Sequence, residues 1–286
     1  MSVKRIIGCI LAAILILVVC QLFALSFARL LALIKVPAVV CNIIAGALYL
    51  GSVYCVLSLI IRKVLKEDLA EYGMPKMNIK LRWIIVAFLL PLLVQCVYIL
   101  FFNGEFIKSE KSANDISTSL AAGIMFIGIA AGFVEEMIFR GVILNLLKEK
   151  WNIYVAVIVP SVLFGIVHII GADFSIGSCL LVIVAGTFVG IMFSMIAIES
   201  GSVWNSGIVH ALWNTLNFGF LYIGEEANSS SLFSYVLESK SFAITGGEFG
   251  IESSVISLIG YIIVTLIAFA MIKFKKKNDN LSSSSL

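Results

Sequence analysis

The sequence predicts an all-α fold: a polytopic transmembrane helical bundle of about eight spans, with both termini on the cytoplasmic side. The chain of 286 residues is 61% hydrophobic and only 13% charged, whereas soluble domains are roughly half apolar and about a quarter charged. Its charged residues are clustered, and the apolar runs between them reach the roughly 20 residues that cross a bilayer. Basic residues also concentrate in alternate loops, which is typical of a polytopic membrane protein.

Eight apolar segments are expected to cross the membrane. They are residues 6–28, 38–61, 83–102, 119–147, 152–170, 177–198, 203–224 and 255–272. The fourth is too long for one straight crossing, so we expect it to tilt or to break near Gly132. The first follows Lys4 and Arg5 as a signal peptide would, but its apolar run is long for one. We therefore expect residues 6–28 to be a retained span.

Loop charges indicate the orientation. Placing the N-terminus in the cytoplasm puts most of the 20 lysines and arginines on that side. The longest loop, residues 225–254, is rich in glutamate and is expected to be a solvated outer loop. Residues 275–286 are expected to form a disordered cytoplasmic tail. The sequence contains no evident repeat or soluble segment, so residues 1–286 are expected to form a single integral membrane domain.

Few ionisable groups lie deep in the predicted spans. The fourth span contains Glu135, Glu136 and Arg140, the fifth contains His168 and the seventh contains His210. Ionisable side chains inside a membrane are costly and usually functional. The six cysteines, in contrast, lie in apolar runs and are expected to be packing residues without a disulfide framework.

Helical geometry separates the two glutamates. Glu136 and Arg140 are four residues apart, so they lie on one helix face and can form an ion pair. Glu135 points about 100° away and can face a cavity. One arginine neutralises only one of the two carboxylates, and a carboxylate without a partner is suited to act as a general base.

The other polar residues also share faces at a spacing of four. Phe164 pairs with His168 in this way, and His210 pairs with Asn214. The helical rise puts Glu136 at roughly 18 Å from the cytoplasmic turns, His168 at roughly 26 Å and His210 at roughly 12 Å. These unequal depths are unfavourable for a shared site unless a tilt, a kink or a longer turn closes the gap.

These residues form three motifs that resemble the signature of the CPBP family, the CAAX-processing and bacteriocin-processing (Abi) intramembrane proteases. The motifs are Glu135-Glu136-x-x-x-Arg140, Phe164-x-x-x-His168 and His210-x-x-x-Asn214. Each motif alone is weak, but three in order on separate spans are specific. The resemblance covers about residues 119–220, which would form a CPBP-like catalytic core.

The resemblance implies an intramembrane endopeptidase similar to CAAX prenyl protease 2 or to a CPBP metalloprotease. Such an enzyme hydrolyses peptide bonds of membrane-embedded or lipid-modified protein or peptide substrates with glutamate-activated water. By this resemblance Glu135 activates the water and His168 assists it. His210 and Asn214 bind the oxyanion or help to hold a metal. Glu136 is also implied as catalytic and braces the first motif with Arg140, while Phe164 is a supporting residue.

Two mechanisms and two other functions stay open. Water can be polarised without a metal, or Zn²⁺ can be held by His168, His210 and Glu135; no other cofactor is expected. Buried acids and histidines also occur in proton-coupled transporters, and a non-catalytic bacteriocin-immunity or membrane scaffold protein can keep them for packing. The lipid bilayer is an expected partner and nucleic acid is not. The expected location is multi-pass in a membrane, which in a prokaryote is the cell membrane.

Overall fold

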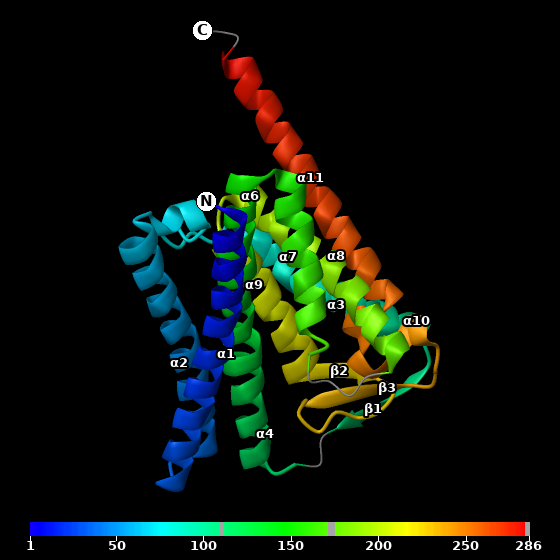
Figure 1. Ribbon diagram of the computed structural model, residues 1–286. Coiled ribbons are helices and arrows are strands. Elements are labelled where there is room, and N and C mark those ends of the chain that lie inside the picture. The colour runs from blue at the N-terminus through cyan, green and yellow to red at the C-terminus, as the bar shows by residue number, and fades with distance from the viewer. Residues whose placement is uncertain (109–110, 171–174, 284–286) are drawn as a thin grey trace.

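The computed structural model describes residues 1–108, 111–170 and 175–283. Long helices form a bundle with a small sheet at one end, and both termini lie at the other end (Figure 1). Within the described residues, six helices are long and apolar enough to cross a membrane. They are α1 (Val3–Leu33), α2 (Ala38–Leu59) with its continuation η1 (Ile60–Leu65), α3 (Leu81–Phe101), the long helix Ala113–Lys150, α8 (Ile176–Ser200) and α11 (Val255–Ser283).

The other two predicted spans are shorter in the structure. The fifth corresponds to α7 (Ile153–Val167), which has 15 residues. The seventh corresponds to α9 (Val203–Asn214), which continues as η5 (Thr215–Phe220). The count of eight crossings and the cytoplasmic orientation of the termini stay predictions. Within the described residues no disulfide joins the cysteines, as expected.

The long fourth helix does not break at Gly132. It consists of α4 (Ala113–Ala121), η3 (Ala122–Ala131), α5 (Gly132–Glu136), η4 (Met137–Ile143) and α6 (Leu144–Lys150), and both η3 and η4 are π-helical. Such widened turns are rare in proteins overall, and those that occur are often found at functional sites. A Cβ at Gly132 would lie only 2.7 Å from the backbone nitrogen of Ala211. The glycine therefore lets α5 approach α9 closely, just before the two glutamates.

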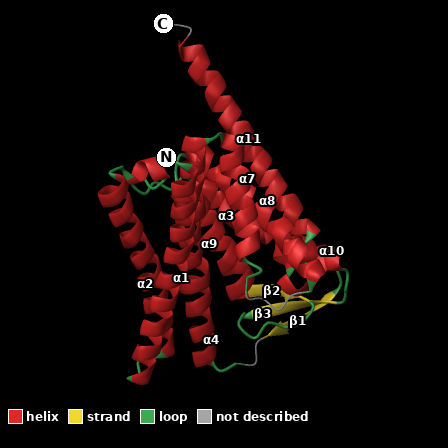
Figure 2. Cartoon of the chain, in the orientation of Figure 1, coloured by secondary structure: helices red, strands yellow, loops and turns green. Residues whose placement is uncertain are grey.

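The all-α prediction is wrong in one respect, because a three-stranded sheet closes one end of the bundle (Figure 2). The strands β1 (Gly104–Lys108), β2 (Leu221–Gly224) and β3 (Phe233–Leu237) lie in the order β1-β3-β2. The β1 strand runs antiparallel to β3 and pairs Phe106 with Tyr235, whose ring centroids are 4.7 Å apart. These partners are far apart in the sequence, so no local pattern indicated the pairing.

Three short helices connect the sheet to the last helix. They are α10 (Phe242–Thr245), η6 (Gly247–Phe249) and η7 (Ile251–Ser253). The structure then continues α11 to Ser283, instead of the disordered tail expected from residue 275. Lysine is a good helix former, so the run Lys275-Lys276-Lys277 does not interrupt the helix. Residues 284–286 lie outside the described residues.

A loop that contains the short helix η2 (Leu69–Tyr72) covers the start of α9. The N–H of Val203 donates to the Gly73 carbonyl at 2.8 Å, and the Trp204 indole donates to the Pro75 carbonyl at 2.7 Å. Val203 and Trp204 are both buried. The α9 helix therefore begins beneath this loop and not at the surface of the bundle.

Candidate active site

The two adjacent glutamates of α5 face different environments. Glu136 is completely buried, whereas 20% of the Glu135 side chain is exposed and lines a cavity. Consecutive helical residues diverge by about 100°, so Glu136 points toward Arg140 and Nδ1 of His210, whereas Glu135 points into the cavity. This arrangement confirms the prediction that Glu135 faces a cavity while Glu136 pairs within the bundle.

Glu136 joins Arg140 and His210 in a buried network. Arg140 Nη1 donates to Glu136 Oε1 at 2.8 Å, and His210 Nδ1 lies 3.2 Å from the same oxygen. The guanidinium also lies 4.6 Å from the ring centroid of Phe164 and 5.3 Å from that of Phe193. Glu136 does not line the cavity, and it contacts the ring of His210 from behind the cavity wall.

The tautomer of His168 follows from its local hydrogen bond. The residue caps the C-terminus of α7, and its Nδ1 lies 2.6 Å from the Phe164 carbonyl oxygen. A carbonyl oxygen only accepts, so Nδ1 carries the proton and the lone pair is on Nε2. The Phe164 ring lies 4.5 Å from the His168 ring and 5.9 Å from the His210 ring.

The unequal depths expected for the two histidines are therefore corrected, because both contact the same phenylalanine. The helical rise assumed that the turn before α9 lies at the surface of the bundle. That turn lies under the loop that contains η2, where Val203 and Trp204 are buried. A helix that begins inside the protein carries its first residues deeper than its loop length suggests.

His210 and Asn214 lie one turn apart on α9, and both face the cavity. His210 Nε2 is 3.8 Å from Glu135 Oε2, too far for a direct hydrogen bond and close enough for one water to bridge both atoms. The Asn214 amide donates to the Ile127 carbonyl at 3.0 Å, within the π-helical η3. Because an amide has two N–H groups, Asn214 retains one donor for a ligand.

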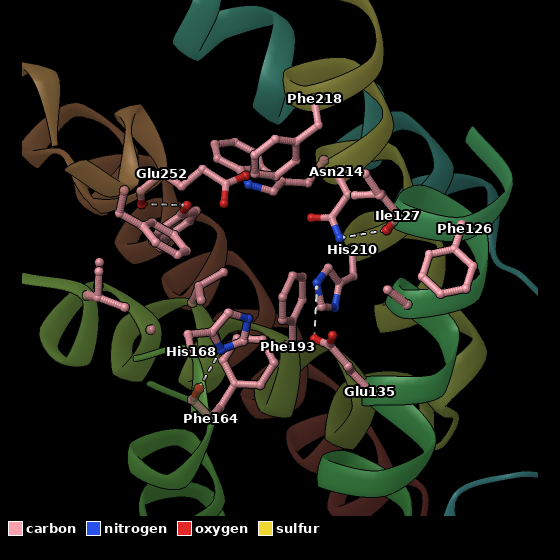
Figure 3. Close-up of a pocket in the computed structure, with 18 of the residues that line it drawn as sticks. Phe126, Ile127, Glu135, Phe164, His168, Phe193, His210, Asn214, Phe218 and Glu252 are labelled. Carbon is pink, nitrogen blue, oxygen red and sulfur yellow. Dashed lines mark hydrogen bonds and ion pairs between the residues drawn. The ribbon is translucent and has the colours of Figure 1, made fainter. Parts of the chain in front are cut away.

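The cavity brings together most of the predicted site. It has a volume of about 310 Å³, and Figure 3 shows Glu135, His168, His210 and Asn214 around it. Aromatic and aliphatic side chains form most of its wall, and they come mainly from α8 and η3, with single rings from α7, α9, η5, η6 and α11. Phe164 also lines it, whereas Glu136 and Arg140 lie behind it. A cavity of this size with a few convergent polar groups is typical of a ligand site.

Sequence reasoning missed one carboxylate in this cavity. Glu252 lines the wall from η7, although the sequence assigned its loop to solvent. In Figure 3 it lies on the opposite side of the cavity from Glu135. Its neighbours in the sequence resemble any polar loop, and no motif marks it.

The donors suit zinc chemically but are not assembled into a metal site. His168 and His210 each direct a hydrogen bond through Nδ1, which leaves Nε2 as the potential ligand atom. Zinc sites in enzymes use three protein ligands at about 2.0–2.2 Å for nitrogen and oxygen. Among residues 1–108, 111–170 and 175–283, no group of three histidine, cysteine, aspartate or glutamate side chains reaches a common point.

Close packing of α7 on α8 sets the position of His168, and Gly165→Ala tests it. An added Cβ would lie 2.7 Å from the Ile183 carbonyl oxygen, so the helices must separate. We expect a loss of about 1–3 kcal/mol in the free energy of unfolding, as for other overpacked sites, measured by detergent-induced unfolding. The control is Gly8→Ala, where nothing lies within 4 Å. Equal stability of the two variants would refute this account of the packing.

Comparisons with known proteins find likenesses to membrane peptidases. Residues 117–216 match a family described as type II CAAX prenyl endopeptidase, Rce1-like. A protein of Bacillus subtilis (strain 168), "Putative membrane peptidase YdiL", is 28% identical over 165 residues. The aligned residues cover 56% of this chain and 64% of that protein, which is less than two thirds of its length. No solved structure matches the chain. Together with six helices of membrane-spanning length, these likenesses confirm the prediction of a multi-pass integral membrane protein.

Proposed function

Because residues 117–216 match the Rce1-like family of type II CAAX prenyl endopeptidases, we propose that this chain is an intramembrane endopeptidase that uses glutamate-activated water. Its substrates are membrane-embedded or lipid-modified proteins or peptides. The observation that carries the proposal is the geometry of Glu135. Its Oε2 atom is buried without a hydrogen-bond partner and lies 3.8 Å from His210 Nε2. A water between these atoms satisfies both.

The hydrolysis begins at this water. Glu135 accepts a proton while the water oxygen attacks the carbonyl carbon of the scissile bond. His168 accepts a hydrogen bond from the water through Nε2 and keeps it oriented, because its Nδ1 is held by Phe164. When the C–N bond breaks, the leaving nitrogen takes the proton from Glu135, and the carboxylate is regenerated.

The tetrahedral oxyanion requires donors in the same cavity. Asn214 supplies the N–H that does not bind Ile127. His210 supplies a second donor only when Nε2 is protonated, because its Nδ1 proton already points at Glu136. The carboxylates of Glu135 and Glu136 lie 3.8 Å and 3.2 Å from its two ring nitrogens and hold the ring between them.

Zinc bound by His168, His210 and Glu135 is the second proposal for water activation. The described ligand atoms do not converge on one point, so no step above is routed through a metal. Metal analysis of the purified protein, paired with chelator treatment of the cleavage reaction, separates the two proposals. Stoichiometric zinc with chelator-sensitive cleavage favours the metal mechanism, and full activity in metal-free protein favours the other.

The proposal predicts that His168→Ala lowers kcat by about 10²-fold or more. The change removes the Nε2 lone pair that orients the water, while the fold keeps the Phe164 ring in place. The measurement is cleavage of a fluorogenic membrane peptide by purified protein in nanodiscs, with thermal stability recorded in parallel. A stable His168→Ala protein with the wild-type rate would contradict this role. Proton flux in liposomes, measured on the same preparations, tests the transporter alternative.

A further inference from the structure

Glu252 is a partly buried residue whose carboxylate the proposed chemistry does not use. Its Oε1 atom is inaccessible to solvent and has no hydrogen-bond partner. The Tyr261 hydroxyl donates to the Glu252 backbone carbonyl at 3.0 Å, which fixes the η7 turn. Burial raises the pKa of Glu252 to about 7, although a hydrogen bond from Trp213 opposes the shift. A buried polar atom without a partner is unusual and requires an explanation.

Other buried carboxylates of the described chain have a basic partner. Glu136 lies 2.8 Å from Arg140, and Glu199 lies 2.5 Å from Arg82. No lysine or arginine of the described residues lies within salt-bridge distance of Glu252, and none lines the cavity. The cavity therefore holds two carboxylates, Glu135 and Glu252, and no lysine or arginine; its basic side chains are His168 and His210, of which His210 lies 3.8 Å from Glu135. Such a site favours a cation over an anion.

The surroundings of Glu252 also suit a long basic side chain. The rings of Trp213, Phe249 and Tyr261 line the same cavity, and the centroids of Trp213 and Tyr261 are 5.3 Å apart. Aromatic faces bind the methylene stem of lysine or arginine and attract its charged group. Glu252 lies outside residues 117–216, the segment that carries the family likeness.

We propose that Glu252 binds a lysine or arginine side chain of the substrate next to the scissile bond, which makes the chain selective for basic peptides. This inference rests on the proposed peptidase function. In it the Glu252 carboxylate forms an ion pair with the substrate cation, on the opposite side of the cavity from Glu135 (Figure 3). A substrate with a free carboxylate at this position is disfavoured by the same charge.

The test compares two peptides that differ only in lysine or norleucine beside the cleavage site. We expect wild-type kcat/KM to favour the lysine peptide by about 10- to 100-fold, as a charge-assisted contact provides. Glu252→Gln should remove this preference while norleucine-peptide cleavage continues. Glu238→Gln is the control, because this exposed glutamate belongs to the same stretch after the seventh predicted span. A wild-type protein that prefers norleucine, or a Glu252→Gln protein that keeps the lysine preference, overturns the inference.

A binding measurement separates this inference from the peptidase proposal. His168→Ala retains both Glu135 and Glu252 and is expected to bind peptide without cleaving it. Fluorescence anisotropy of the labelled lysine and norleucine peptides should show tighter lysine-peptide binding, lost in His168→Ala/Glu252→Gln. If this preference appears but wild-type protein cleaves neither peptide, the inference holds and the peptidase proposal fails. Equal binding of both peptides to His168→Ala overturns the inference even if cleavage occurs.

Discussion

Glu135→Gln is expected to lower kcat by about 10²- to 10⁴-fold, the contribution of a positioned general base. The amide keeps the size of the side chain and its place in the cavity, but it cannot accept the proton of the attacking water. Substrate binding and thermal stability should change little, because Glu135 forms no hydrogen bond through Oε2 and is not paired with Arg140. Cleavage of a fluorogenic membrane peptide by purified protein measures the loss.

The matched control is Glu105→Gln, which removes an exposed carboxylate from β1. This variant should cleave at the wild-type rate, so any loss in Glu135→Gln reflects position and not net charge. A membrane scaffold or immunity protein makes the opposite prediction, because its phenotype would survive Glu135→Gln. Wild-type turnover in a folded Glu135→Gln protein would end the proposal that this carboxylate activates water.

Helical spacing predicted the local part of the site correctly. The separation of Glu135 from Glu136, the Glu136–Arg140 pair and the shared face of Phe164 and His168 all depend on residues within one turn. Such relations follow from 100° per residue and need no tertiary information. For the same reason the sequence indicated which groups face a cavity and which are paired.

The parts that sequence reasoning missed depend on contacts between distant segments. The depth of His210 was misjudged because a loop more than 120 residues away covers the start of α9, where Trp204 donates to Pro75. The sheet pairs Phe106 with Tyr235, which lie far apart in the sequence. The sequence indicated that Glu252 belongs to a solvated loop, whereas in the structure η7 places this residue in the wall of the cavity. No periodic pattern in the sequence indicates any of these three placements.

Arg140→Met is expected to lower the free energy of unfolding by about 3–5 kcal/mol, the cost of leaving one member of a buried ion pair alone. The Glu136 carboxylate would remain fully buried with only His210 as a partner. The lost guanidinium also contacts the Phe164 ring and donates to the Gly190 carbonyl at 3.1 Å. Reversible unfolding in mixed micelles measures the change.

Arg82→Met is the matched control, since it removes an arginine whose side chain is 43% exposed. Its partner Glu199 keeps a second donor in the Trp83 indole at 2.9 Å, so the loss should be about 1 kcal/mol or less. The double change Arg140→Met/Glu136→Gln tests the cause. If the unpaired charge dominates, the double variant is more stable than Arg140→Met alone, because the neutral amide that replaces the carboxylate still accepts a hydrogen bond from His210. If shape dominates, the double variant loses as much free energy of unfolding as Arg140→Met alone, and the buried pair then stabilises the fold by packing and not by charge.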